Sequence, residues 1–157
     1  MKNKYYISII VAFIWVGFVC AISFMESWLK FQAPGITLPL GLGIGRLVFN
    51  ALNKAEWFFA VLISINLVVS KHSFKQVSTI LFAIPIVLLL LQTFWLLPAL
   101  DARAELAISG ATTTPSTLHW WFVGMEVIKV GFLFIFGFIH LKKRIKNDYC
   151  RKSLTQF

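Results

Sequence analysis

Two ionisable residues, Glu126 and Lys129, lie inside an apolar run that extends from His119 to Lys143. A helix rises about 1.5 Å per residue, so the two side chains are expected roughly 10 and 15 Å along the helix from His119, near the middle of a bilayer. An ionisable group at that depth costs about 2.5 to 3.5 kcal/mol on insertion scales. Each of the two side chains is therefore expected either to pair with another polar group or to have a functional role.

The composition of the chain indicates a membrane protein. Of its 157 residues, 59% are hydrophobic and 13% are charged, and the mean hydropathy is +0.80. Soluble domains are typically about 45 to 50% apolar, so a soluble domain of this size is excluded. The net charge of +9 is confined to segments that flank apolar runs. It therefore indicates membrane topology, and nucleic acid is not an expected partner.

Four apolar stretches define the expected architecture. We predict helices over about residues 5–27, 44–70, 77–108 and 118–141, followed by a basic cytoplasmic tail over 142–157. About 20 apolar residues are needed to cross a bilayer as a helix. The sequence thus predicts an all-α, polytopic membrane protein, a four-transmembrane-helix bundle that forms one domain over residues 1–157. The first stretch also resembles a cleaved signal peptide, but its length of about 21 residues favours an uncleaved helix.

The distribution of lysine and arginine along the chain predicts the orientation of this bundle in the membrane. Ten of the fifteen lie in the termini and in the connection between the second and third helices. Four lie toward the opposite side of the bundle (Lys30, Arg46, Lys54 and Arg103), and Lys129 lies in the bilayer. By the positive-inside rule, both termini are cytoplasmic. We expect a multi-pass protein of the bacterial inner membrane, with its two longer connections on the extracytoplasmic side.

This topology gathers the unusual polar residues in the outer half of the bundle and predicts an outward-facing polar pocket. The candidate ligand-binding or proton-relay residues are Glu26, Arg46, Asn50, Glu56, Gln92, Asp101, Arg103, Glu105, His119, Glu126 and Lys129. On the last helix, Gly124 and Gly131 lie on a different face, which suits close helix packing.

The second predicted helix carries a polar stripe of its own. Arg46, Asn50, Asn53 and Trp57 follow one another at spacings of four, three and four residues, which places them on one helical face. Such a face normally lies against the bundle or a water-filled cavity. For Asn53 to Glu56, a solvated turn at the membrane interface is an equally good interpretation.

Several kinds of chemistry find no support in the sequence. It contains no C-x-x-C, H-E-x-x-H or G-x-S-x-G motif, and Cys20 and Cys150 are expected at different depths, where they cannot pair. The G-x-G-x-G before Arg46 follows no strand, which argues against a phosphate-binding loop. We expect no catalytic residues, no metal and no cofactor.

Three functions fit the predicted pocket. The leading one is binding or passage of a small polar ligand, an ion or a proton, carried by Glu126, Lys129, Arg46 and Arg103. The second is a structural or accessory subunit of a membrane complex, in which the buried charges fix helix packing. The third is a membrane enzyme that acts on a lipid headgroup, with arginines facing phosphate. The expected partners are membrane lipids and either a second copy of the chain or another membrane subunit.

The second half of the chain resembles a known group of proteins. The segment F-W-L-L-P-A-L-D-A-R-A, followed after a linker by L-H-W-W-F-V-G-M-E-V-I-K-V-G, is similar to small four-helix membrane proteins of unknown function that include transmembrane protein 205. Trp95, Leu96, Pro98, Arg103 and His119 carry the resemblance, although the arginine is displaced from the position directly after proline. The resemblance implies four helices with both termini inside, and it favours handling of a solute.

Overall fold

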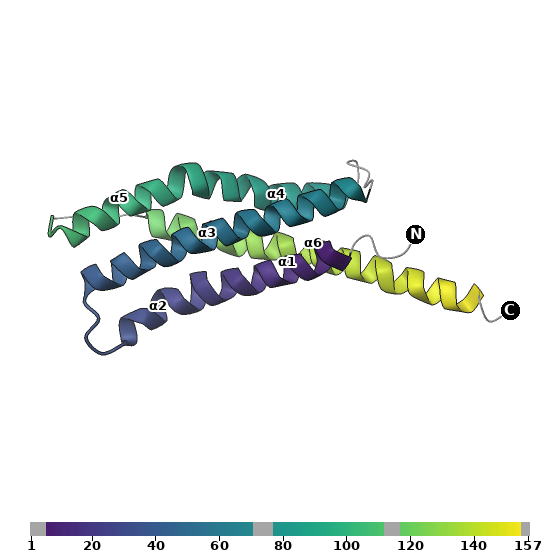
Figure 1. Ribbon diagram of the computed structural model, residues 1–157, viewed down its shortest axis with the longest axis horizontal. Coiled ribbons are helices and arrows are strands. Elements are labelled where there is room, and N and C mark those ends of the chain that lie inside the picture. The colour runs from purple at the N-terminus through teal and green to yellow at the C-terminus, as the bar shows by residue number, and fades with distance from the viewer. Residues whose placement is uncertain (1–5, 71–76, 112–116, 155–157) are drawn as a thin grey trace.

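A computed structural model describes residues 6–70, 77–111 and 117–154, and for residues 77–79 and 147–154 it describes the backbone alone. The described chain is built from helices, grouped into four long rods (Figure 1). The first rod is α1 (Tyr6–Val19), the π-helical segment η1 (Cys20–Glu26), α2 (Ser27–Leu29) and the 3₁₀ turn η2 (Lys30–Gln32). The second is α3 (Leu38–Val69), the third is α4 (Val77–Leu91), the π-helical segment η3 (Gln92–Leu96) and α5 (Leu97–Ile108), and the fourth is α6 (Leu118–Leu154).

Each rod is long and apolar enough to cross a membrane. The candidate spans are Tyr6–Gln32, Leu38–Val69, Ile80–Ile108 and Leu118–Lys146. The predicted all-α class and four spanning helices are therefore confirmed. The segments between the second and third predicted helices, and between the third and fourth, lie mostly outside the described residues.

The connection between the first two rods is shorter than the sequence suggested. Gly35 has a φ of +79°, a left-handed conformation that glycine adopts without steric cost, and it turns the chain after η2. Thr37 then caps α3, because its hydroxyl accepts a hydrogen bond from the backbone N–H of Leu40, and Pro39 fits the first turn, where no N–H is needed. As a result α3 begins at Leu38 and not near residue 44.

The third rod is bent where α4 passes into α5 (Figure 1). Pro85 lies inside α4 and cannot donate a backbone hydrogen bond, and η3 widens the helix for one turn. Both Gln92 and Leu96, at the two ends of η3, are buried. Gln92, the strongly polar residue within the apolar part of this rod, therefore lies inside the bundle at the bend.

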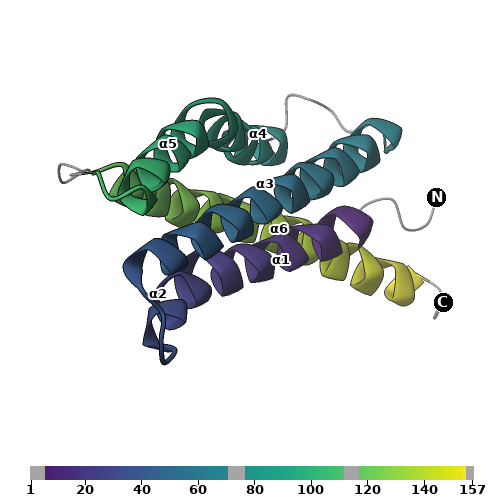
Figure 2. The ribbon, with the colours of Figure 1, turned by 60° about the vertical axis from the view of Figure 1, so that its left-hand side comes forward.

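The rods pack as a four-sided bundle in which α6 contacts α1 and α4, and α3 contacts α1 and α5 (Figure 2). The start of α1 and the end of α6 lie at the same end, and α6 continues beyond the other rods there (Figure 1). The predicted tail is thus helical as far as Leu154. We call the opposite end the distal end; it is formed by α2, η2, α5 and the starts of α3 and α6.

Gly124 and Gly131 do not bring two helices of this chain together. A Cβ atom added to either residue would meet nothing within 4 Å, and both residues are exposed on α6. The predicted close packing on this face is therefore not found among the described residues, because Glu126 and Lys129, not the glycines, define the face that α6 turns inward.

Candidate functional site

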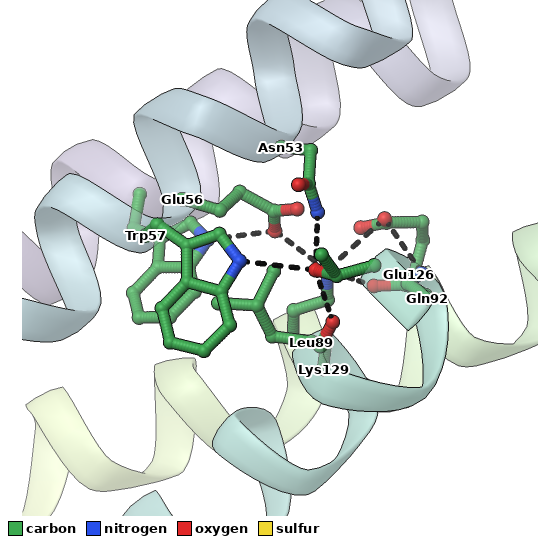
Figure 3. Close-up of polar contacts among 9 residues, drawn as sticks. Asn53, Glu56, Trp57, Leu89, Gln92, Glu126 and Lys129 are labelled. Carbon is green, nitrogen blue, oxygen red and sulfur yellow. Dashed lines mark hydrogen bonds and ion pairs between the residues drawn. The ribbon is translucent and has the colours of Figure 1, made fainter. Parts of the chain in front are cut away.

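The interior of the bundle holds a charge cluster centred on Lys129. Its ammonium nitrogen Nζ lies 2.5 Å from Glu56 Oε1, 2.5 Å from Gln92 Oε1 and 3.1 Å from Glu126 Oε1. Lys129 and Glu126 are 0% exposed, Gln92 is 1% exposed and Glu56 is 2% exposed. Figure 3 shows the four side chains converging from α3, η3 and α6.

The first rod completes this cluster through Trp15. Its indole N–H donates to Glu56 Oε1 over 2.8 Å, and the side chain is fully buried. The amide of Gln92 donates to Glu126 Oε1 over 2.9 Å. We use the name charge cluster for Trp15, Glu56, Gln92, Glu126 and Lys129, which together join all four rods.

Apolar side chains close the charge cluster on both sides. Toward the distal end lie Leu96 and Phe122, both buried, and Phe49, whose ring centroid is 5.0 Å from that of Phe122. Toward the opposite end lie fully buried aliphatic side chains, among them Ile63, Leu89 and Leu133. Interactions in such a water-poor setting are much stronger than at a surface.

A second polar group lies beside the cluster, around the hydroxyl of Thr93. This hydroxyl accepts hydrogen bonds from Asn53 Nδ2 at 2.9 Å and Trp57 Nε1 at 3.0 Å, and donates to the backbone carbonyl of Leu89 at 2.7 Å (Figure 3). The four residues of the polar stripe predicted on the second helix therefore belong to two places. Asn53 and Trp57 bind Thr93 of the third rod beside the charge cluster, whereas Arg46 and Asn50 lie nearer the distal end.

The distal end contains a pocket of about 280 Å³ between all four rods. We call it the distal pocket. Most of its wall is apolar, and its polar side chains are Ser27, Lys30, Arg46, Asp101 and His119. The remaining lining residues are Phe31, Gly41, Leu42, Gly45, Phe49, Leu97, Leu100 and Ala104.

Lys30 reaches this pocket through a recess in α3. A Cβ atom on Gly41 would clash with the ring of Phe31, so Phe31 could not lie where it does beside a larger residue. A Cβ atom on Gly45 would lie 2.9 Å from Lys30 Nζ, and the flexible end of Lys30 would have to shift. Lys30 Nζ is 3.4 Å from Glu26 Oε2 and lies 5.5 and 5.4 Å from the ring centroids of Phe31 and Phe49. Its ammonium group is thus held against aromatic faces.

Arg46 is the second cation of the distal pocket, and its ion pairs are long. Its guanidinium lies 3.5 Å from Asp101 Oδ1 and 3.8 Å from Glu105 Oε2, and Glu105 is largely exposed. Asn50 Nδ2 donates to Asp101 Oδ2 over 3.3 Å and to the backbone carbonyl of Arg46 over 2.9 Å. These contacts link α3 to α5.

The predicted site residues therefore fall into two groups and not into one pocket. Glu56, Gln92, Glu126 and Lys129 belong to the charge cluster. Near the distal pocket lie Glu26, Arg46, Asn50, Asp101, Glu105 and His119, of which Arg46, Asp101 and His119 line it. Arg103 is partly buried on α5 and does not line the pocket.

The structure differs from the sequence-based prediction at Glu56, Trp15 and Lys30. The solvated interfacial turn considered for Asn53 to Glu56 is wrong for Glu56, which is buried because it pairs with Lys129. Trp15 and Lys30 were not among the predicted site residues. Trp15 could have been found, because a tryptophan in the middle of an apolar span, away from the interfacial belts, needs an acceptor for its N–H.

Neither a metal site among the described residues nor a similar known protein identifies the function of this site. Among residues 6–70, 77–111 and 117–154, no three His, Cys, Asp or Glu side chains are placed to hold a metal ion. Comparisons of the chain with protein-family models, with curated proteins and with solved structures gave no match. The resemblance to transmembrane protein 205 stays a prediction.

Proposed function

We propose that this multi-pass membrane protein binds a small ligand, composed of an anionic group and an apolar body, in the distal pocket. Under the predicted topology, this pocket faces the extracytoplasmic side of a bacterial inner membrane. The observation that supports the proposal is a contrast between two lysines. Among the described residues, Lys129 has an acceptor for every N–H it carries and Lys30 does not.

An ammonium group has three N–H donors. Lys129 directs them to three oxygens at 2.5 to 3.1 Å, so it has no capacity left for a ligand. Within the described part of the chain, Lys30 has one acceptor, Glu26, at 3.4 Å. The guanidinium of Arg46 makes no hydrogen bond to a described side chain, and its ion pairs are 3.5 and 3.8 Å long. Both cations of the distal pocket can therefore still bind an anion.

The shape of the pocket limits the ligand. About 280 Å³ is near the lower end of the range of small-molecule sites, roughly 300 to 1,000 Å³. Leu42, Leu97 and Leu100 provide apolar wall in the same pocket as the two cations. A carboxylate or phosphate beside Lys30 and Arg46, with a short hydrocarbon portion against the leucines, satisfies both surfaces.

The charge cluster supports the structural role as a second candidate. Its polar contacts reach every rod, which fits a function in fixing helix packing. Passage of a solute through the bundle would require the apolar layer of Phe49, Leu96 and Phe122 to open. We therefore assign ligand binding to the distal pocket and helix packing to the charge cluster.

The proposal is tested by binding measurements on the full chain in lipid nanodiscs. We expect decanoate to bind roughly 10- to 150-fold more tightly than decanol, because a hydrogen bond to a charged group contributes about 1.5 to 3 kcal/mol. Lys30→Met should reduce this preference, because only Arg46 then remains of the two described cations beside the anionic group. Lys54→Met, which removes an exposed lysine of α3, should retain it in full. Equal affinities for the two probes in wild type, or an unchanged preference in Lys30→Met, would overturn the proposal.

A further inference from the structure

The charges of the charge cluster do not balance when every group is ionised. Two carboxylates, Glu56 and Glu126, face one ammonium group, Lys129, which leaves a net charge of −1. All three side chains are at most 2% exposed. An uncompensated charge buried at the centre of a bilayer is among the most costly arrangements in a protein, so one more positive charge is required.

The described surroundings do not provide that charge. Facing the two carboxylates are Trp15 from α1, Gln92 from η3 and Lys129 from α6, and of these only Lys129 is a cation. The next layers, Leu96 and Phe122 on one side and Leu89 and Leu133 on the other, are apolar. Arg46 and Lys30 lie at the distal pocket, beyond the apolar layer.

The two carboxyl groups are held differently. Glu56 Oε1 accepts two short hydrogen bonds, 2.8 Å from Trp15 and 2.5 Å from Lys129, as an ionised carboxylate does. Glu126 Oε1 accepts two longer ones, 2.9 Å from Gln92 and 3.1 Å from Lys129. The second oxygen of Glu126, Oε2, is buried and has no hydrogen-bond partner among the described residues.

We propose that the charge cluster is a binding site for a single proton, which is carried on Glu126 Oε2. With this proton the cluster is neutral: Glu56 is ionised, Lys129 is charged and Glu126 is a carboxylic acid. A neutral hydroxyl without a partner costs less to bury than a charged oxygen without one. This proton site is separate from the distal pocket, and it stands whether or not a ligand binds there.

Infrared spectroscopy of the full chain near neutral pH, in a detergent without carbonyl groups, tests this assignment, because a protonated carboxyl has a C=O stretching band that a carboxylate lacks. Wild type should show this band, and Glu126→Gln should lack it. Glu56→Gln should also lack it, although Glu126 is intact, because one carboxylate then balances Lys129. Glu105→Gln, at a largely exposed position, is the matched control and should keep the band.

Three results would overturn the assignment. They are the absence of the band in wild type, its survival in Glu126→Gln, and its survival in Glu56→Gln. If neither cluster variant folds, wild type grown with ¹³C-labelled glutamate decides the question, because the protonated band must then shift with the label. A band that does not shift belongs to another group, and the assignment fails.

Discussion

Lys129 connects three rods through one nitrogen atom, and its removal leaves two buried carboxyl groups without a cation. Breaking a buried ion pair from one side typically costs about 3 to 5 kcal/mol. We expect Lys129→Met to lower the free energy of unfolding by about that amount, measured by denaturant titration followed by tryptophan fluorescence. Lys54→Met should be close to neutral.

The stability lost in Lys129→Met should be recovered when the two carboxylates of the charge cluster are also made neutral. Replacing a whole buried ionic group by neutral residues is often neutral or stabilising. The triple variant Lys129→Met, Glu56→Gln, Glu126→Gln should therefore be more stable than Lys129→Met alone. If the triple variant is less stable, the loss in the single variant arises from packing around the lysine stem and not from unpaired charge.

Trp15 supplies a hydrogen bond as well as a large buried ring. In Trp15→Phe most of the ring is kept, but Glu56 loses the indole donor at 2.8 Å. A hydrogen bond to a charged group contributes about 1.5 to 3 kcal/mol, so we expect a loss of that order in the free energy of unfolding. Trp28→Phe is the matched control, because Trp28 is exposed, and an equal loss there would show that the donor is not the cause.

At the scale of elements, the start of α3 is shaped by the glycines at positions 41 and 45. A Cβ on Gly41 would lie 2.2 Å from the ring of Phe31, whereas one on Gly43 would meet nothing within 4 Å. We expect Gly41→Ala to displace Phe31 and weaken decanoate binding, and Gly43→Ala to leave binding unchanged. Gly43→Ala should also raise the free energy of unfolding by about 0.5 to 1 kcal/mol, as alanine does at an unobstructed helical position.

Binding isotherms and thermal unfolding curves, measured on the same samples, test the Gly41→Ala and Gly43→Ala predictions. Equal effects of Gly41→Ala and Gly43→Ala on binding would mean that the recess in α3 does not shape the distal pocket. The two positions share one helical turn, so general effects on helix propensity cancel between them.

The sequence predicts the spans well because apolar length is a local property. It predicts the partners of Glu126 and Lys129 poorly, since these depend on how each rod is rotated about its axis. The π-helical segment η3 is one reason: an extra residue in a turn shifts every later side chain around the rod, and no residue type in Q-T-F-W-L indicates it. Glu56 was ambiguous for the same reason, because a carboxylate at that position fits an interface or a buried partner equally well.

At the scale of the whole molecule, two polar sites follow one another along the bundle. The cations of the distal pocket have N–H donors without an acceptor among the described residues. The charge cluster has a saturated lysine and one unbalanced carboxyl. Between them lies one apolar layer, formed by Phe49, Leu96 and Phe122. Spacing along the sequence suggested one pocket, but the helix faces divide its residues between two levels.

The orientation of the bundle determines which side of the membrane reaches the distal pocket, and lysine and arginine predict the extracytoplasmic side. Cysteine labelling in cells with a membrane-impermeant maleimide measures this orientation, in a background with Cys20→Ala and Cys150→Ser. Ala33→Cys, in the exposed turn after η2, should react in intact cells. Lys146→Cys, exposed near the opposite end of α6, should react only after permeabilisation. The reverse pattern would place the distal pocket in the cytoplasm, and its anionic ligand would then have to come from there.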